Sequence, residues 1–132
     1  MRRAGTIVLA TLVAAGAVGL GAAQAPPGIT RTPLLQEDLS TPGREAIQVL
    51  VGFEPGAAFP AHSHPGEELV YVTRGSLQYT IAGQPPVTLE AGDVLFIPAR
   101  AVHSVRNVGK DEGTELATYV VEKGQPLLVL AE

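Results

Sequence analysis

Two stretches of this chain, GAAFPAHSHPGEELVYVTRG (residues 56–75) and GDVLFIPARAVHSVRN (residues 92–107), carry its strongest structural signal. Together they contain all three histidines of a sequence that has no cysteine. His62 and His64 are separated by one residue, so on an extended segment both side chains point to the same side of a sheet. A carboxylate and the third imidazole, His103, can join them from neighbouring strands and complete a set of donors around one divalent ion.

The rest of the chain after residue 40 reads as short strands. Segments rich in β-branched and aromatic residues alternate with Gly, Pro and Asp turns, and no helical period is sustained. Such regular spacing predicts an all-β fold, a sandwich or a closed barrel. The expected strands span residues 46–54, 68–73, 76–82, 86–90, 93–97, 102–108 and 115–122.

The N-terminal segment predicts a signal peptide over residues 1–25. It begins with Met1-Arg2-Arg3, continues with an apolar run from Ile7 to Leu20, and ends in small residues. This order is typical of a secretory signal, and cleavage after Ala23 or after Ala25 fits it. The apolar run is shorter than the roughly 20 residues of a membrane-spanning helix. We therefore expect an exported protein, periplasmic or secreted, with no stable membrane association after cleavage.

The remaining chain is expected to comprise an extended lead-in, residues 26–40, and one barrel domain, residues 41–132. Removing Arg2 and Arg3 from the nine basic residues leaves seven against thirteen acidic ones, a net charge near −6. Such an acidic domain is a poor electrostatic partner for nucleic acid, and no nucleic-acid partner is expected. Without cysteine no disulfide can form, so core packing, a metal or an oligomer contact must stabilise the fold.

The two stretches resemble the paired motifs of the cupin superfamily, whose members are small jelly-roll barrels. The first motif is a glycine, five residues, His-x-His, three or four residues, Glu, six residues and a glycine. The second is a glycine, five residues, Pro-x-Gly, two residues, His, three residues and Asn. The matching positions are Gly56, His62, His64, Glu68 and Gly75 in the first motif and Gly92, Pro98, His103 and Asn107 in the second. Arg100 departs from the pattern, because it stands where glycine is usual.

The resemblance predicts a single small jelly-roll β-barrel that holds one divalent transition metal. It implies His62, His64, Glu68 and His103 as the ligands. Glu67 competes for the carboxylate position, but the spacing to the following glycine selects Glu68. Imidazole and carboxylate donors suit Fe, Mn, Ni, Cu and Zn, and the sequence does not choose among them. An octahedral ion with these four ligands keeps two open positions for water or a small molecule.

The sequence also offers candidates for catalytic and supporting roles around the metal. Glu67 and Tyr79 are the candidate catalytic groups for proton transfer. Tyr79 shares a face with its neighbours two residues away, and it either lines the metal cavity or packs as an ordinary core tyrosine. Asn107 either supports the ligands from behind or closes the turn that follows it. No cofactor other than the metal is expected.

Two functions fit these features. The first is a metalloenzyme that acts on a small molecule by dioxygen-dependent oxidation. The second is a non-catalytic barrel that binds or senses a small ligand and uses the metal for structure. Turnover of a defined substrate separates the two. The resemblance also implies a homodimer, and the apolar residues on both faces of residues 68–73 agree with one, although a second sheet can equally cover them.

Overall fold

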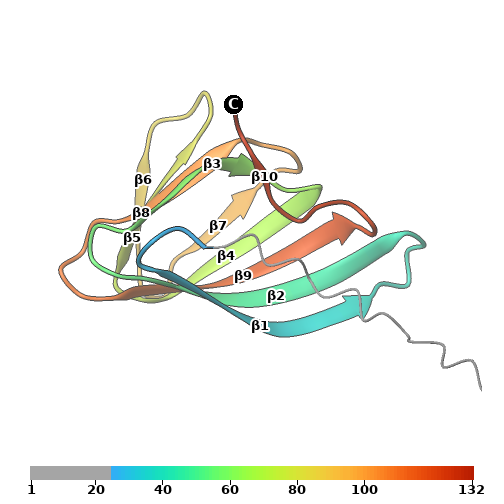
Figure 1. Cartoon of the computed structure of the whole chain (residues 1–132), viewed down its shortest axis with the longest axis horizontal. Helices are drawn as coiled ribbons and strands as arrows, with labels where there is room; N and C mark the ends of the chain where they lie inside the picture. The colour runs from blue at the N-terminus through green and yellow to red at the C-terminus, as the bar shows by residue number, and fades with distance from the viewer. Residues whose placement is uncertain (1–24) are drawn as a thin grey trace, which may run out of the picture.

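The computed structural model describes residues 25–132, so the predicted signal peptide, apart from Ala25, lies outside the described residues. Two five-stranded antiparallel sheets face each other in this part of the chain (Figure 1). The predicted all-β, jelly-roll-like fold is therefore confirmed. Between residues 25 and 132 there is no helix of the length and apolarity that a membrane crossing requires.

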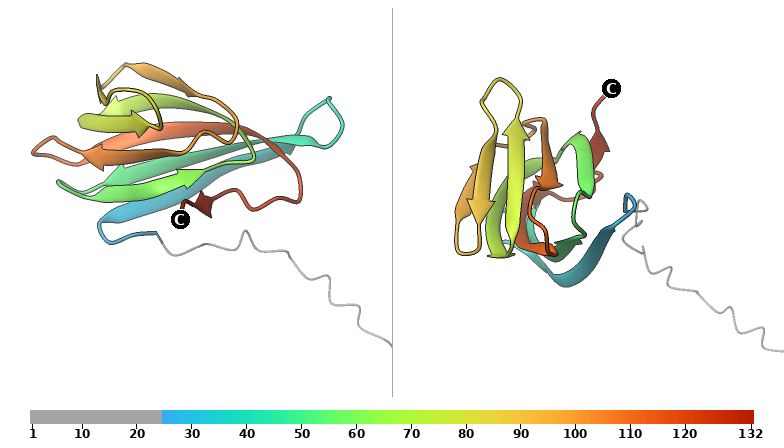
Figure 2. Two further views of the ribbon diagram at one scale, coloured as in Figure 1. Left: turned by 90° about the horizontal axis from the view of Figure 1, so that it is seen from above. Right: turned by 90° about the vertical axis from the view of Figure 1, so that its left-hand side faces the viewer.

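The two sheets stack against each other, as the right-hand view in Figure 2 shows. Their buried apolar residues form one cluster. The first sheet has the strand order β1-β2-β9-β4-β7 and the second has the order β10-β3-β8-β5-β6. The strands of the first sheet are β1 (Ile29–Asp38), β2 (Arg44–Phe53), β9 (Gly113–Glu122), β4 (Gly66–Arg74) and β7 (Val94–Ile97). Those of the second are β10 (Val129–Leu130), β3 (Ala58–Ser63), β8 (His103–Asn107), β5 (Ser76–Ile81) and β6 (Val87–Glu90).

All seven expected strands are present, with ends within about two residues of the expected bounds. Residues 26–40, the expected lead-in to the barrel, are part of the first sheet instead. Most of this segment forms β1, which pairs with β2 along its whole length, with one irregularity between Pro33 and Leu35. The alternation of apolar and polar residues is weak in β1, because β1 is an edge strand whose residues after Arg31 are mostly exposed. Its pairing partner, rather than its own pattern, therefore places it in the sheet.

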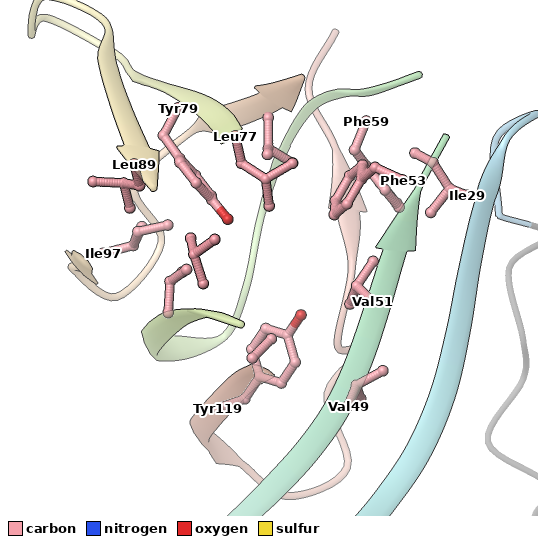
Figure 3. Packing of buried hydrophobic residues seen from close by; sticks show 14 of the residues in the cluster. Ile29, Val49, Val51, Phe53, Phe59, Leu77, Tyr79, Leu89, Ile97 and Tyr119 are labelled. Carbon is pink, nitrogen blue, oxygen red and sulfur yellow. The ribbon is translucent and has the colours of Figure 1, made fainter. Parts of the chain in front are cut away.

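The core follows the two-residue period of the strands. In β9 every second residue from Gly113 to Val121 is buried. In β4 the side chains of Val70 and Val72 point inward, and those of Leu69 and Tyr71 point outward. Figure 3 shows the inward side chains from both sheets meeting in one cluster. The core thus lies between the sheets, and any polar side chain in the inward register is buried with it.

The outward side of the first sheet keeps large apolar side chains exposed. We call this surface the outer apolar face; it consists of the exposed Leu69, Tyr71, Val94 and Phe96 and the half-buried Leu116. Val94 is 69% exposed and Phe96 is 58% exposed. The residues line one hollow on adjacent strands β7, β4 and β9. No second sheet covers this face within residues 25–132. Of the two expected ways to cover these residues, a second sheet is therefore not the one found there.

Arg100 explains why its motif position usually holds glycine. Its φ is +63°, and it is the one non-glycine residue with positive φ among residues 25–132. A side chain in this left-handed conformation costs about 1–2 kcal/mol. The backbone N–H of Arg100 donates to the carbonyl of His64, and its guanidinium pairs with Glu122 at 3.0 Å. The turn therefore accepts arginine, and the charge lies at an exposed ion pair rather than in the barrel.

Replacing Arg100 by glycine should stabilise the domain. The change removes the left-handed strain, while the greater freedom of glycine in the unfolded chain offsets about 0.4–1 kcal/mol of the gain. The exposed ion pair contributes little. We expect Arg100→Gly to raise the free energy of unfolding by about 0.5–1 kcal/mol, measured by urea denaturation. Arg100→Ala keeps the strain and is the matched control; equal stability of the two variants would contradict this explanation.

Candidate metal centre

The fold brings the three histidines and Glu68 to one place between the sheets. His62 is on β3 and His64 follows the end of that strand, and both side chains are buried. His103 is the first residue of β8 and lies directly opposite His62 in the ladder. Glu68 is on β4 of the other sheet. Four buried polar side chains from two sheets therefore converge inside an otherwise apolar core.

The histidines are arranged so that each presents one nitrogen to the cluster. The Nδ1 atom of His62 lies 2.7 Å from the carbonyl oxygen of Pro60, and that of His103 lies 2.9 Å from the carbonyl oxygen of Ala101. The Nδ1 atom of His64 lies 2.6 Å from the carbonyl oxygen of Leu127. A carbonyl can only accept, so each Nδ1 carries the proton and each Nε2 has a free lone pair. One ligand nitrogen of each ring lies within 4.8 Å of the others.

Glu68 completes the cluster. Its Oε2 atom lies 3.1 Å from Nε2 of His64 and 3.0 Å from Nε2 of His103. Despite these distances, Oε2 of Glu68 and Nε2 of His64 are buried without a hydrogen-bond partner among residues 25–132. Buried polar atoms are normally paired, because burial without a partner costs free energy. A divalent cation among these atoms would satisfy them together, so the donor set fits a metal ion.

The ionisation of these groups also suits a cation. Burial lowers the pKa of His62 to about 4, which leaves this ring neutral at pH 7. Burial opposes the charge on Glu68, but hydrogen bonds that the His103 and His64 rings donate when their Nε2 atoms are protonated outweigh burial and lower the pKa of the Glu68 carboxyl to about 2. Burial likewise lowers the pKa of His103, yet the Glu68 carboxylate beside it raises the pKa above its ordinary value. The carboxylate is thus ionised, and His62 is ready to bind metal without losing a proton.

A small cavity of about 20 Å³ adjoins the cluster, room for about one water molecule. Its walls combine ligand-set residues with apolar and polar side chains from both sheets. The polar lining residues include His62, Glu68, His103, Tyr79, Glu115 and Arg31. The cavity is therefore the place where a small molecule can approach the metal-binding atoms.

Tyr79 and Glu115 form a buried pair in this cavity. Tyr79 is on β5, and Figure 3 shows its hydroxyl reaching into the space between the sheets. That hydroxyl donates to Oε2 of Glu115 on β9. Burial, together with the negative charge of Glu68, raises the pKa of Glu115 to about 8. Burial and Glu115 raise the pKa of Tyr79 as well. Tyr79 thus lines the cavity, the first of its two predicted roles.

Sequence reasoning missed Glu115 and Arg31. Glu115 shares its register with Ala117, Tyr119 and Val121, so the alternation of β9 contains the signal of an inward carboxylate. Arg31 belongs to the segment expected to lead into the barrel, and only its pairing opposite Val51 places it beside the cavity.

Neither Glu67 nor Asn107 lines the cavity. Glu67 lies on β4 next to Glu68 but faces outward, where Arg44 pairs with it at 2.9 Å. It is absent from the cavity lining, so its position gives no support to a proton-carrying role. Asn107 is buried and its amide nitrogen donates to the carbonyls of Phe53 and Asp111, while its oxygen accepts from Gly109. Asn107 therefore closes the turn and links the two sheets.

Known proteins with related sequences or folds include enzymes. Dimethylsulfoniopropionate lyase DddQ of Ruegeria pomeroyi is 35% identical over 63 residues, which is 47% of this chain and 31% of the lyase. This chain thus matches about a third of that relative's length. A solved oxalate oxidase in complex with glycolate has a TM-score of 0.65 and 28% identity, and the match covers 80% of this chain and 56% of the oxidase.

A solved cupin superfamily protein of Desulfitobacterium hafniense shares the fold. Its TM-score is 0.61 at 21% identity, and the match covers 75% of this chain and 83% of that protein. The sequence model of the cupin domain family matches residues 49–121, more than half of the chain. That match extends from β2 into β9 and contains both motifs with their three histidines and Glu68. The chain therefore belongs to the cupin domain family.

Proposed function

We propose that this protein is an exported, metal-dependent cupin that binds or oxidises a small molecule at a mononuclear centre. The proposed ligands are His62, His64, Glu68 and His103. The observation that carries the proposal is the grouping of the three histidines, with Nε2 of His64 and of His103 beside Oε2 of Glu68. Nε2 of His64 and Oε2 of Glu68 are buried without a partner among residues 25–132. Each ring is fixed from behind by a backbone carbonyl, as is usual for metal-ligating histidines.

A bound divalent ion would supply positive charge and open coordination positions for a small molecule. The relatives described above include a lyase and an oxidase that act on small organic molecules, which supports a catalytic role. The small cavity, with room for about one water, favours the alternative of a non-catalytic barrel with a structural metal. Turnover by the metal-loaded protein would separate the two. The order of residues before Ala25 supports export to the periplasm or the medium.

The Tyr79–Glu115 pair is the group best placed to hold a proton in this cavity. Both side chains are buried, and the phenol and carboxyl are directly hydrogen-bonded. The raised pKa of Glu115, about 8, keeps its carboxyl protonated at neutral pH. A neutral acid near a metal-binding site can donate a proton to a bound molecule. Glu115 thus replaces Glu67 as the candidate acid, with Tyr79 as its partner.

The outer apolar face supports a homodimer. Leu69, Tyr71, Val94, Phe96 and Leu116 lie together on one side of the first sheet. An exposed cluster of large apolar side chains of this kind marks an interaction surface. A second copy of this chain would bury the face by the same residues on both partners, as a two-fold interface requires.

The ligand set predicts the metal content of single variants. Protein purified without chelators or affinity metals should carry about one equivalent of a divalent transition metal, measured by elemental analysis. His62→Ala and His103→Ala should reduce this content to near zero, because each removes one of four donors. Glu67→Ala, which removes an outward carboxylate next to a ligand, should keep most of the metal. Retention of metal by both histidine variants would show that the ligand assignment is wrong.

The raised pKa of Glu115 predicts how the stability of the metal-free protein depends on pH. Its folded pKa, about 8, exceeds its ordinary value of 4.5, so the folded state binds the proton more tightly. Its contribution to stability is complete below about pH 4.5 and is lost as pH rises through 8. Between pH 6.5 and 8.5, the free energy of unfolding should fall less steeply with pH in Glu115→Gln than in wild type. The difference in slope should reach up to about 1.4 kcal/mol per pH unit. Urea denaturation measures this, and parallel profiles would contradict it.

The dimer predicts a difference between two exposed valines. Val94→Asp places a charge on the outer apolar face and should convert a dimer to a monomer. Val87→Asp makes the same change on β6 of the other sheet, where the valine is 38% exposed, and should leave the dimer intact. Size-exclusion chromatography with light scattering measures both masses. A monomeric wild-type protein, or a dimeric Val94→Asp variant, would exclude this interface.

A further inference from the structure

Arg31 brings a positive charge to the cavity beside the proposed metal centre. It lies on edge strand β1, opposite Val51, and its half-buried side chain lines the cavity together with His62, His103 and Glu68. It is the one lysine or arginine in the lining as the structure describes it. Arg31 therefore contributes a cation to a space otherwise lined by histidines, acids, phenols and apolar groups.

Within residues 25–132 the guanidinium of Arg31 has no carboxylate partner. All ion pairs in this part of the chain involve other basic residues. Arginine is seldom removed from water without a partner. Its planar donors match a carboxylate in two parallel hydrogen bonds, more closely than the single ammonium of lysine does. An unpaired guanidinium beside a cavity is thus suited to an incoming carboxylate.

The acidic side chains of the same lining do not pair with Arg31. The Oε2 atom of Glu115 accepts from the Tyr79 hydroxyl, and no ion pair joins Glu115 or Glu68 to Arg31 within residues 25–132. The polar neighbour of Arg31 is instead the phenol of Tyr119, which is hydrogen-bonded to the arginine side chain. The positive charge of Arg31 is therefore not matched by a carboxylate in direct contact.

The charge and size of the cavity restrict what can bind. A divalent ion held beside Glu68 would give the cavity a net positive charge, to which Arg31 would add. Opposite charges attract more strongly in such a partly buried site than in water. The space beside the histidines, about 20 Å³, has room for about one water-sized group, so only one small group of a ligand can reach them while the rest of the molecule stays toward the open side of the cavity.

We propose that the cavity binds a small organic acid whose carboxylate pairs with Arg31 while a second oxygen-bearing group of the same molecule faces His62 and His103. This inference rests on the proposed metal centre and names the class of molecule that the centre would take. Arg31 is the residue that recognises the acid. His62, His103 and Glu68 line the same small cavity and would receive the other end of the molecule.

Oxalate is a suitable probe, because it is a small acid with oxygen donors at both ends. Isothermal titration calorimetry would measure its binding to the zinc-loaded and the metal-free full chain. Arg31→Gln should weaken oxalate binding to the zinc-loaded protein about tenfold or more, because a charge-assisted bidentate pair is lost. Arg31→Lys, which keeps the charge but not the planar fork, should fall between wild type and Arg31→Gln.

Arg106→Gln is the matched control. Arg106 is an exposed arginine on β8 that does not line the cavity, so its loss changes net charge equally and should leave oxalate affinity unchanged. In the metal-free protein, oxalate should raise the melting temperature of wild type more than that of Arg31→Gln. This second measurement does not depend on the metal, and the melting temperature without oxalate reports whether each variant is folded.

The possible results separate the two proposals. Zinc binding with equal oxalate affinity in wild type, Arg31→Gln and Arg106→Gln would overturn the role of Arg31 and leave the metal centre intact. Failure of zinc to bind the wild-type protein would overturn the metal centre. In that case the oxalate-induced shift of the metal-free protein still decides the role of Arg31, because an equal shift in wild type and Arg31→Gln would overturn it.

Discussion

The hydrogen bonds from three histidine Nδ1 atoms to backbone carbonyls are the constraint on which the centre of this protein depends. The carbonyls belong to Pro60, Ala101 and Leu127, which lie on three different segments. Two are local, two residues from the histidine concerned, and the third comes from near the C-terminal strand β10. Because each carbonyl holds one nitrogen as a donor, the opposite nitrogens face one another with free lone pairs. Ring orientation is thereby determined before any ligand arrives.

This arrangement places a costly polar cluster inside an apolar core. Glu68 is held ionised although it is almost completely buried, and its Oε2 atom lies between two imidazoles without a hydrogen bond. Unpaired buried polar groups destabilise a fold by roughly 1–3 kcal/mol each. The surrounding sheets compensate through packing, since the chain has no disulfides. A group that bound these atoms in the folded state alone would stabilise the domain by mass action.

Side chains alternate between the two faces of the first sheet, so the same strands form both the cavity wall and the outer apolar face. On β4, Glu68 points to the cluster, while its neighbours Glu67 and Leu69 point outward. On β9, Glu115 points into the cavity, while Leu116 belongs to the outer apolar face. A shift of register by one residue would exchange these faces, so the cavity and the exposed apolar surface are specified together.

Much of the fold and the donor set could be predicted from local pattern. The alternation of apolar residues placed seven strands, and the spacing of His62, His64, Glu68 and His103 identified the four side chains that meet, because side-chain direction along a strand is a local property. Edge strand β1 lacked such alternation. Tertiary structure alone decided its place in the sheet and the position of Arg31 beside the cavity. It also decided the contact of Leu127 with His64 and the pairing of Tyr79 with Glu115. The physical reason is that these contacts depend on which strands pair and how the sheets stack, and these join residues distant in the sequence.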